Sequence, residues 1–208
     1  MQNRKLENIF VTPLFTSEFS DKGKCDSIES FLRDLRKTGA GTEKKNTWQS
    51  PDNLHEYEEL KEITVELLQE SEIVFDAMKV SRESVYINNM WAQITTHANN
   101  HDVHIHPNSY ISGILYVKSP PVCGETILHN PTLRDLMIQP EITEFVPMNC
   151  AKWVVQPEKG KLLLFPSWIP HSVRQGYDFQ DGEERISLAF TVMFKAAVKT
   201  FTTKIKYI

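Results

Sequence analysis

The sequence lacks the features of several large protein classes. None of its apolar runs is long enough to cross a membrane, and the first residues, MQNRKLENIF, have no signal-peptide core. Its three cysteines, Cys25, Cys123 and Cys150, lie far apart and form no CxxC pair. This spacing argues against a disulfide framework or a zinc ribbon and predicts a reducing, cytoplasmic location. Internal repeats and low-complexity segments are also missing.

Positive charge is not in excess either. The formal net charge is −4, so we expect neither nucleic acid nor a membrane surface as a partner. The basic run KTFTTKIKY falls in residues 196–208, which we interpret as a solvated C-terminal tail. With 208 residues, 40% of them hydrophobic, the chain is long enough for one core and is predicted to form a single domain.

Residues 1–83 are predicted to be mostly helical. In DSIESFLRDLRKTG the apolar residues repeat at helical spacing, Asp26 or Ser27 can cap the start, and Gly39 can close the end. The next segment, residues 40–53, is expected to be a loop. A second helical stretch follows, and its apolar side consists of Tyr57, Leu60, Ile63, Leu67 and Leu68.

Residues 84–195 have the pattern of a β domain. Six short runs are rich in β-branched and aromatic residues and are bounded by Pro, Gly, Asn or Ser: VYINNMWAQITT, YISGILYVKS, ETILHN, AKWVVQP, KLLLFPS and RISLAFTVMF. Successive strands without a long helix between them predict an antiparallel sandwich or barrel. The fold class is therefore mainly β, a jelly roll with the N-terminal helices packed on it. Residues 130–145 could form a short helix or a loop that closes over a site.

Histidines cluster in NNHDVHIHPNS. In a strand, residues i, i+2 and i+4 project from one face, so DVHIH would place Asp102, His104 and His106 together as possible metal ligands. By the same alternation His101 would point away. The competing interpretation is a polar strand end whose histidines bond to nearby backbone.

A second histidine strengthens the metal hypothesis. In GKLLLFPSWIPHSV, His171 follows an apolar strand and a proline-bounded turn and begins a new strand. A jelly roll gathers distant strand ends at one mouth, where ligands bind. His129 has no comparable motif and is left out of the predicted site.

An arginine opens the last apolar strand. Arg185 begins RISLAFTVMF, and Arg is rarely buried without a partner. Its planar fork matches a carboxylate, and Ser187 lies on the same face of the strand. The alternatives are a salt bridge to an acidic residue of DFQDGEE, or Arg174 as the clamp, which strand alternation makes less suitable.

Together these motifs resemble the Fe(II)- and 2-oxoglutarate-dependent oxygenases, most closely the branch found in bacteria and phages. The resemblance rests on HIHPNSYISGILYV, GKLLLFPSWIPHSV and RISLAF and covers about residues 84–195. It implies a double-stranded β-helix, Fe(II), 2-oxoglutarate as co-substrate and O2 as oxidant. It also implies that Arg185, Ser187 and Tyr116 hold the co-substrate, and that an unidentified peptidyl or small-molecule substrate is hydroxylated.

The sequence departs from the family at one position. Where the pattern HxD/E places a carboxylate, this chain has His106. Three ligand sets stay open: His104, His106 and His171, which we favour; Asp102 in place of His106; or one histidine of HIH with His171 and water.

Two other functional classes fit part of the pattern. A cupin-like three-histidine metalloenzyme suits the missing carboxylate but leaves Arg185 without a role. A jelly-roll binding module without catalysis would bind no metal tightly. Near the predicted site, Trp168 is the better candidate for a substrate contact, whereas Trp91 is expected in the core.

Overall fold

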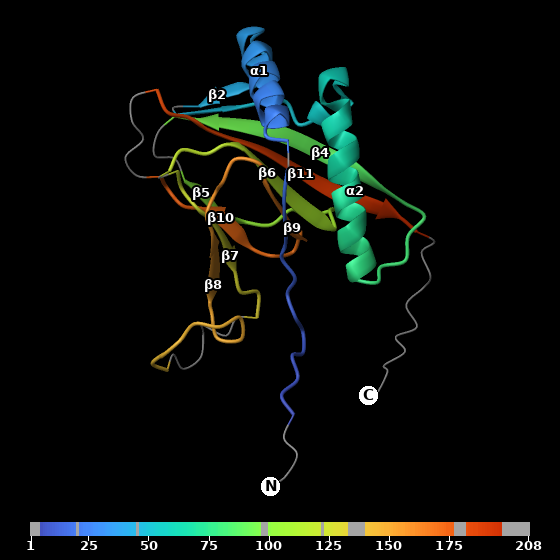
Figure 1. Ribbon diagram of the computed structural model, residues 1–208, viewed down its shortest axis with the longest axis vertical. Coiled ribbons are helices and arrows are strands. Elements are labelled where there is room, and N and C mark those ends of the chain that lie inside the picture. Colours follow the sequence, from blue (N-terminus) through green and yellow to red (C-terminus); the bar gives the residue numbers. More distant parts are fainter. Residues whose placement is uncertain are drawn as a thin grey trace.

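Two antiparallel β-sheets form the body of the protein. The computed structural model describes residues 5–19, 21–44, 46–96, 100–121, 123–132, 140–176 and 182–196. The larger sheet has the order β1 (Phe15–Glu18), β9 (Lys161–Pro166), β6 (Ile111–Lys118), β11 (Arg185–Lys195), β4 (Ser84–Thr95), β3 (Thr47–Gln49) and β2 (Thr42–Lys44). The smaller sheet has the order β5 (His101–His104), β10 (His171–Val173), β7 (Thr126–His129) and β8 (Lys152–Val155). This arrangement, shown in Figure 1, confirms the predicted mainly β fold.

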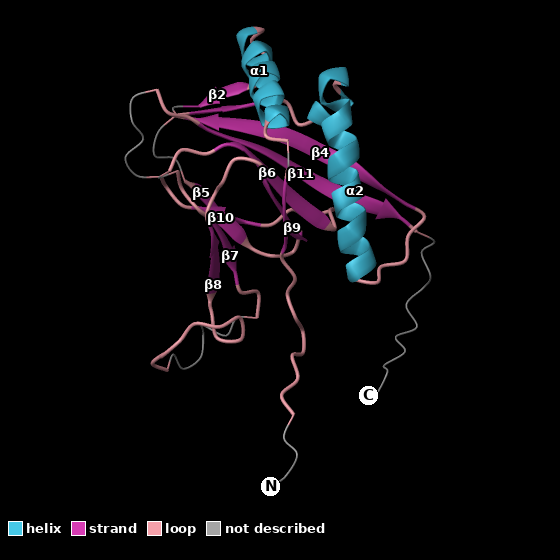
Figure 2. Cartoon of the chain, in the orientation of Figure 1, coloured by secondary structure: helices cyan, strands magenta, loops and turns pink. Residues whose placement is uncertain are grey.

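Two helices cover the outer face of the larger sheet. They are α1 (Gly23–Lys37) and α2 (Lys61–Ala77), and two short 3-10 turns, Leu54–Glu56 and Glu58–Leu60, precede α2. Both helices lie on the same side of β4 and β11, as Figure 2 shows. Their buried residues form one hydrophobic core with the outer face of the larger sheet, in agreement with the predicted helical layer.

Side chains of strand β11 point alternately to the two faces of the larger sheet, and each face has its own apolar cluster. It pairs along its length with β4 on one side and β6 on the other. Alternate residues from Ile186 to Val192 are buried in the core under the helices. Arg185 and Ser187 therefore face the other way, into the space between the two sheets. That space holds a second apolar cluster of Tyr116, Leu128, Val155, Leu163, Phe165 and Ile169.

Helix α1 is tied to the larger sheet by ion pairs as well as by apolar packing. Glu29 accepts hydrogen bonds from Arg33 (2.7 Å) and from Lys118 at the end of β6 (3.1 Å). Arg33 also pairs with Glu184, the residue before β11, and Arg36 lies 3.9 Å from the same carboxylate. The acidic residue that precedes Arg185 is thus bound to the helical layer.

The N-terminal third contains strands that the sequence did not predict. Thr42–Lys44 and Thr47–Gln49, expected to lie in a loop, form the paired strands β2 and β3, which extend the larger sheet. Trp48 fixes this hairpin because its ring is buried and its Nε1–H donates to the carbonyl oxygen of Ala40 at 2.9 Å. The short exposed strand β2 shows no apolar alternation, which is the signal that strand prediction requires.

The ends of α1 test the two capping predictions. The expected N-caps, Asp26 and Ser27, lie inside the helix; instead Asp21 Oδ1 accepts the backbone N–H of Gly23 at 2.8 Å. At the other end Gly39 has a φ of +85° and donates to the carbonyl of Arg36, as predicted for a glycine that closes a helix.

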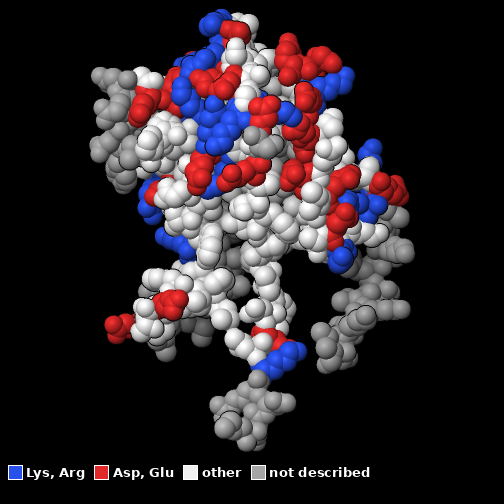
Figure 3. All heavy atoms as spheres, in the orientation of Figure 1, with Lys and Arg blue, Asp and Glu red and all other residues white. Residues whose placement is uncertain are grey.

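Charges of both signs are interspersed over the face seen in Figure 3. No helix in the described part of the chain is long and apolar enough to span a membrane. Of the predicted closing loop, residues 133–139 lie outside the described residues, as do residues 197–208 of the predicted tail.

The contact between Gly113 and Phe190 yields a prediction about stability. A Cβ atom on Gly113 would lie 2.1 Å from Cζ of Phe190, so we expect Gly113→Ala to lower the free energy of unfolding by about 1–3 kcal/mol. In the Gly113→Ala background, Phe190→Leu should cost less than it does in the wild type, because the smaller side chain relieves the clash. Urea denaturation of both single variants and the double variant measures this coupling, and additive costs would contradict it.

Candidate metal centre and co-substrate pocket

Three histidines from two chain segments meet between the two sheets. His104 ends β5, His171 begins β10, and these two residues are paired in the antiparallel ladder. His106 follows β5, and its backbone N–H donates to the carbonyl of Ser167 at 3.2 Å. One ring nitrogen from each of the three histidines lies within 4.8 Å of the others. The structure therefore brings together the three side chains that we favoured as ligands.

Backbone hydrogen bonds set the tautomers of two of these rings. Nδ1 of His104 lies 2.8 Å from the carbonyl oxygen of Asp102, and Nδ1 of His171 lies 3.0 Å from that of Ile169. A carbonyl oxygen only accepts, so each Nδ1 carries the hydrogen, and Nε2 of a neutral ring keeps its lone pair. That is the orientation in which histidines bind metals in proteins.

Burial also keeps the rings of His106 and His171 uncharged, which metal binding requires. Desolvation lowers the pKa of His171, which is 3% exposed, to about 3, and the nearby histidines add to the effect. The pKa of His106 is lowered to about 4, mainly by desolvation and further by the nearby rings of His104 and His101. Both rings are thus neutral at pH 7, the form that coordinates a cation.

A β-bulge changes the expected alternation of β5. His104 pairs with His171, but Val173, two residues on, pairs with His101, three residues back, so β5 has one extra residue. As a result His101 shares the face of His104, and their ring centroids lie 4.3 Å apart. The expectation that His101 points away is wrong for this reason.

The same bulge moves Asp102 away from the cluster. Its side chain is exposed, and its Oδ1 accepts a hydrogen bond from Asn100 at 3.1 Å. Asp102 is not among the residues whose ligand atoms gather. What it does contribute is its backbone carbonyl, which orients the ring of His104.

Arg185 is buried without an acidic partner in the described part of the chain. It is 8% exposed, and its Nη1 donates to the backbone carbonyl of Gly124 at 3.0 Å. Desolvation lowers its pKa, the direction expected for a cation in an apolar interior. Glu184, one of the acidic residues considered as its partner, pairs with helix α1 instead. A buried guanidinium of this kind needs an anion.

Three hydroxyl groups, those of Tyr116, Thr126 and Ser187, share the interior with Arg185. Tyr116 is fully buried, and desolvation raises its pKa to about 12 even though nearby Arg185 lowers it. Its phenol donates to Oγ1 of Thr126 at 2.6 Å. Because Tyr116 supplies that hydrogen, the hydrogen of Thr126 can point to another acceptor. Ser187 is buried directly opposite Tyr116 in the β11–β6 ladder.

Sequence reasoning missed Thr126 and Gly124. No motif marks Thr126, because its position is defined only by the Tyr116 contact across two different strands. Gly124 acts through its backbone, and a Cβ atom there would lie 1.6 Å from the carbonyl oxygen of Arg174. The glycine between Cys123 and Glu125, just before β7, is the sequence signal that could have drawn attention to it.

The other candidates lie at the edge of the site or outside it. Trp91 contacts His106 with ring centroids 5.5 Å apart and is only partly buried, so it lines the site and not the core. Trp168 is 47% exposed and packs edge-on against Tyr110. Arg174 forms a surface ion pair with Glu125 (3.4 Å), whereas His129 bonds to Ser172. Neither belongs to the histidine cluster.

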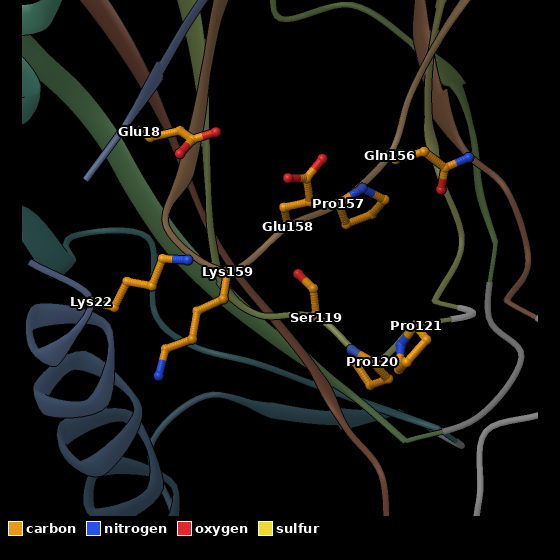
Figure 4. A pocket seen from close by; sticks show the side chains of 9 residues that line it. All are labelled: Glu18, Lys22, Ser119, Pro120, Pro121, Gln156, Pro157, Glu158 and Lys159. Carbon is orange, nitrogen blue, oxygen red and sulfur yellow. The ribbon is translucent and has the colours of Figure 1, made fainter. Parts of the chain in front are cut away.

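Two cavities lie in different parts of the molecule. The smaller, about 210 Å³, borders Arg185 and His101 and is also lined by Gln49, Gln93, Thr95 and Asn100. The larger, about 510 Å³, is shown in Figure 4 and is lined by residues that include Lys22, Ser119 and Pro157. It contains none of the histidines, and two of its charged residues, Glu158 and Lys159, already have ion-pair partners. The smaller cavity is therefore the one that borders Arg185 and that adjoins the histidine cluster through His101.

The donor set fits a divalent transition metal. Three imidazoles with free ring nitrogens on one side leave other coordination positions open for ligands such as a keto acid and oxygen. Arg185, Tyr116, Thr126 and Ser187 supply one cation and three hydroxyl groups in the same interior. This combination suits an acid that binds the metal at one end and the guanidinium at the other.

Solved structures with the same fold include metal-dependent oxygenases. A prolyl-4-hydroxylase from Pseudomonas putida is 13% identical over 89% of this chain and 94% of its own, with a TM-score of 0.63. HygX from Streptomyces hygroscopicus, solved with nickel and 2-oxoglutarate bound, is 15% identical over 89% and 84%, with a TM-score of 0.58. The α-ketoglutarate-dependent epimerase SnoN of nogalamycin biosynthesis is 9% identical over 89% and 79%, with a TM-score of 0.65. At these identities the likeness shows the fold, a double-stranded β-helix.

A family model adds evidence from the sequence itself. Residues 89–191 match the model described as "Putative 2OG-Fe(II) oxygenase", and this stretch contains all three histidines and Arg185. A search of the curated proteins gave no match. The chain therefore carries, in residues 89–191, a domain of the 2-oxoglutarate- and Fe(II)-dependent oxygenases, a family of oxidoreductases.

Proposed function

We propose that the protein is a hydroxylase that binds Fe(II) through His104, His106 and His171 and holds 2-oxoglutarate with Arg185. The observation that carries the proposal is the burial of Arg185. Its side chain is 8% exposed, and its guanidinium has no carboxylate partner in the described residues. Such a group is costly to bury alone, and a dicarboxylic co-substrate removes the cost. The three imidazoles in the same interior could hold the metal that this co-substrate binds.

The residues around Arg185 have distinct roles in this proposal. The guanidinium is oriented by the carbonyl of Gly124 and binds the distal carboxylate of 2-oxoglutarate. Thr126, whose oxygen accepts from Tyr116, donates its own hydrogen to the same carboxylate, and Ser187 adds a further hydroxyl. Tyr116 thus acts through Thr126, whereas our sequence analysis expected it to touch the carboxylate directly.

The overall reaction has the stoichiometry R–H + 2-oxoglutarate + O2 → R–OH + succinate + CO2. One oxygen atom enters the product and the other enters succinate, so no further reductant is needed. Bound Fe(II) supplies the activation of oxygen and its coupling to decarboxylation. The protein positions the co-substrate, and the partly buried ring of Trp91 beside His106 limits access of water to the centre. We infer that R–H is a peptidyl or small-molecule C–H bond.

A cupin-like three-histidine metalloenzyme is the second candidate. The specific observation in its favour is that no aspartate or glutamate joins the three histidines in the described part of the chain. It predicts metal binding without any dependence on 2-oxoglutarate. The buried Arg185 argues for the first candidate, because the second gives that residue no anion to bind.

The ligand assignment predicts unequal effects of four substitutions. His104→Ala, His106→Ala and His171→Ala should each weaken anaerobic Fe(II) binding by more than about 100-fold, since even partners that only support a ligand contribute about 10–100-fold. Asp102→Ala should change it little, because the backbone carbonyl that orients His104 remains. His129→Ala, outside the cluster, is the matched control. Loss of binding in Asp102→Ala but not in His106→Ala would overturn our choice of the third ligand.

The co-substrate assignment predicts a separate effect at Arg185. Arg185→Gln should raise KM for 2-oxoglutarate by roughly 10–100-fold, the range expected for losing hydrogen bonds to a charged group. Anaerobic Fe(II) affinity should stay unchanged, because Arg185 does not contact the histidines' ring nitrogens. Arg174→Gln, which removes only a surface ion pair, is the control.

Succinate formation, measured with Fe(II), O2 and varied 2-oxoglutarate, gives these KM values without knowledge of the primary substrate. An unchanged KM in Arg185→Gln would contradict the proposed clamp. Fe(II) binding with no succinate in the wild-type protein would favour the cupin-like alternative.

A further inference from the structure

Two glutamines form a pair on the floor of the cavity beside the proposed site. Gln49 of β3 and Gln93 of β4 lie directly opposite each other in the antiparallel ladder. Their neighbours in sequence, Trp48, Ala92 and Ile94, are buried in the core under the helices, so the two amides face the opposite way, toward the cavity of about 210 Å³ that both residues line. Both side chains are partly exposed and therefore open to a ligand.

The two amides engage each other only in part. Nε2 of Gln93 donates to Oε1 of Gln49 at 3.2 Å. This bond leaves the carbonyl of Gln93 and the NH2 group of Gln49 without a partner among the residues that the structure describes. If both amides were rotated by 180°, the bond would run the other way and again leave one carbonyl and one NH2 group. The pair thus presents one free acceptor and one free donor in either orientation.

The rest of the cavity is polar and adjoins the reaction centre. The described residues that line it include the cations Lys44 and Arg185 and no aspartate or glutamate, so a ligand of the glutamine pair can also carry negative charge elsewhere. His101, another lining residue, stacks against His104 with ring centroids 4.3 Å apart, so the cavity adjoins the histidine cluster. Arg185 lines the cavity as well, which places the co-substrate within reach of the same space.

We propose that Gln49 and Gln93 recognise the primary substrate through the edge of a primary carboxamide or a cyclic cis-amide. Such an edge carries a C=O and an N–H side by side and matches the free NH2 and carbonyl of the pair, as amide side chains match mixed edges elsewhere. This inference rests on the proposed function, which supplies the reaction. The co-substrate is a poor match, because its carboxylates and keto group only accept hydrogen bonds and would leave one glutamine carbonyl unsatisfied.

The probe for this edge is 2-pyrrolidone, a small cyclic cis-amide. Its matched control is γ-butyrolactone, which has the same ring and carbonyl but no N–H. Both are titrated into the full-length protein loaded with Zn(II) and 2-oxoglutarate, which cannot turn over, and binding is followed by the side-chain amide NMR signals. The signals of Gln49 and Gln93 are assigned from their absence in Gln49→Met and Gln93→Met.

We expect 2-pyrrolidone to shift the amide signals of both glutamines and to bind at least about tenfold more tightly than γ-butyrolactone, since one hydrogen bond distinguishes them. Each methionine variant should weaken 2-pyrrolidone binding by a similar factor. Gln69→Met, at an exposed position of α2, should leave it unchanged. The Kd of 2-oxoglutarate should be the same in all four proteins, which shows that the variants fold and retain the co-substrate pocket.

Several results would overturn the inference. One is equal binding of the lactam and the lactone. A second is unchanged 2-pyrrolidone affinity when one glutamine is replaced, with the signals of the other glutamine still shifted. A third is displacement of 2-oxoglutarate by 2-pyrrolidone. The last result would assign the pair to the co-substrate. Succinate formation by the Fe(II)-loaded protein is measured separately, so the proposed function can fail while lactam binding succeeds, and the reverse.

Discussion

Strand β11 pairs with β4 on one side and with β6 on the other, and this pairing determines where the side chains of the proposed site lie. It fixes which residues of β11 face the helices and which face the interior, and so it places Arg185 and Ser187 opposite Tyr116. A shift of one residue would turn Arg185 into the apolar core under the helices and Ile186 into the co-substrate pocket. The same register places Gln93 of β4 beside Ser187. Fold and chemistry therefore depend on a single alignment of three strands.

Charge balance links the two halves of the proposed site. Imidazole ligands carry no negative charge, so the three histidines would leave the positive charge of a divalent metal uncompensated by the protein, and Arg185 adds another buried cation. A dianionic co-substrate offsets two of these three positive charges. Metal and co-substrate should accordingly strengthen each other's binding, since any coupling between two ligands is reciprocal. A metal centre with a carboxylate ligand would depend less on that anion.

The sequence was sufficient for the parts of the structure that follow from local patterns. Alternating apolar residues located the long strands, and the motifs HIH, PHSV and RIS identified the three histidines and Arg185 before their geometry was known. The face of His101 was mispredicted because alternation assumes a regular strand and β5 contains a bulge. Thr126 and the Gln49–Gln93 pair could not be found, because each is defined by a contact between strands. The register of two strands cannot be predicted from the sequence of either strand alone.

The ion pairs of α1 matter for a fragment of this enzyme that lacks the helical layer. Residues 89–191 contain the family match, yet Glu184 within them is neutralised by Arg33 and approached by Arg36, both from α1. A fragment without the helical layer would release this carboxylate one residue from Arg185, in competition with the co-substrate, and would uncover the apolar face of the larger sheet. The region that sequence comparison outlines thus lacks the helix that binds Glu184 and keeps this carboxylate away from the arginine that we propose binds the co-substrate.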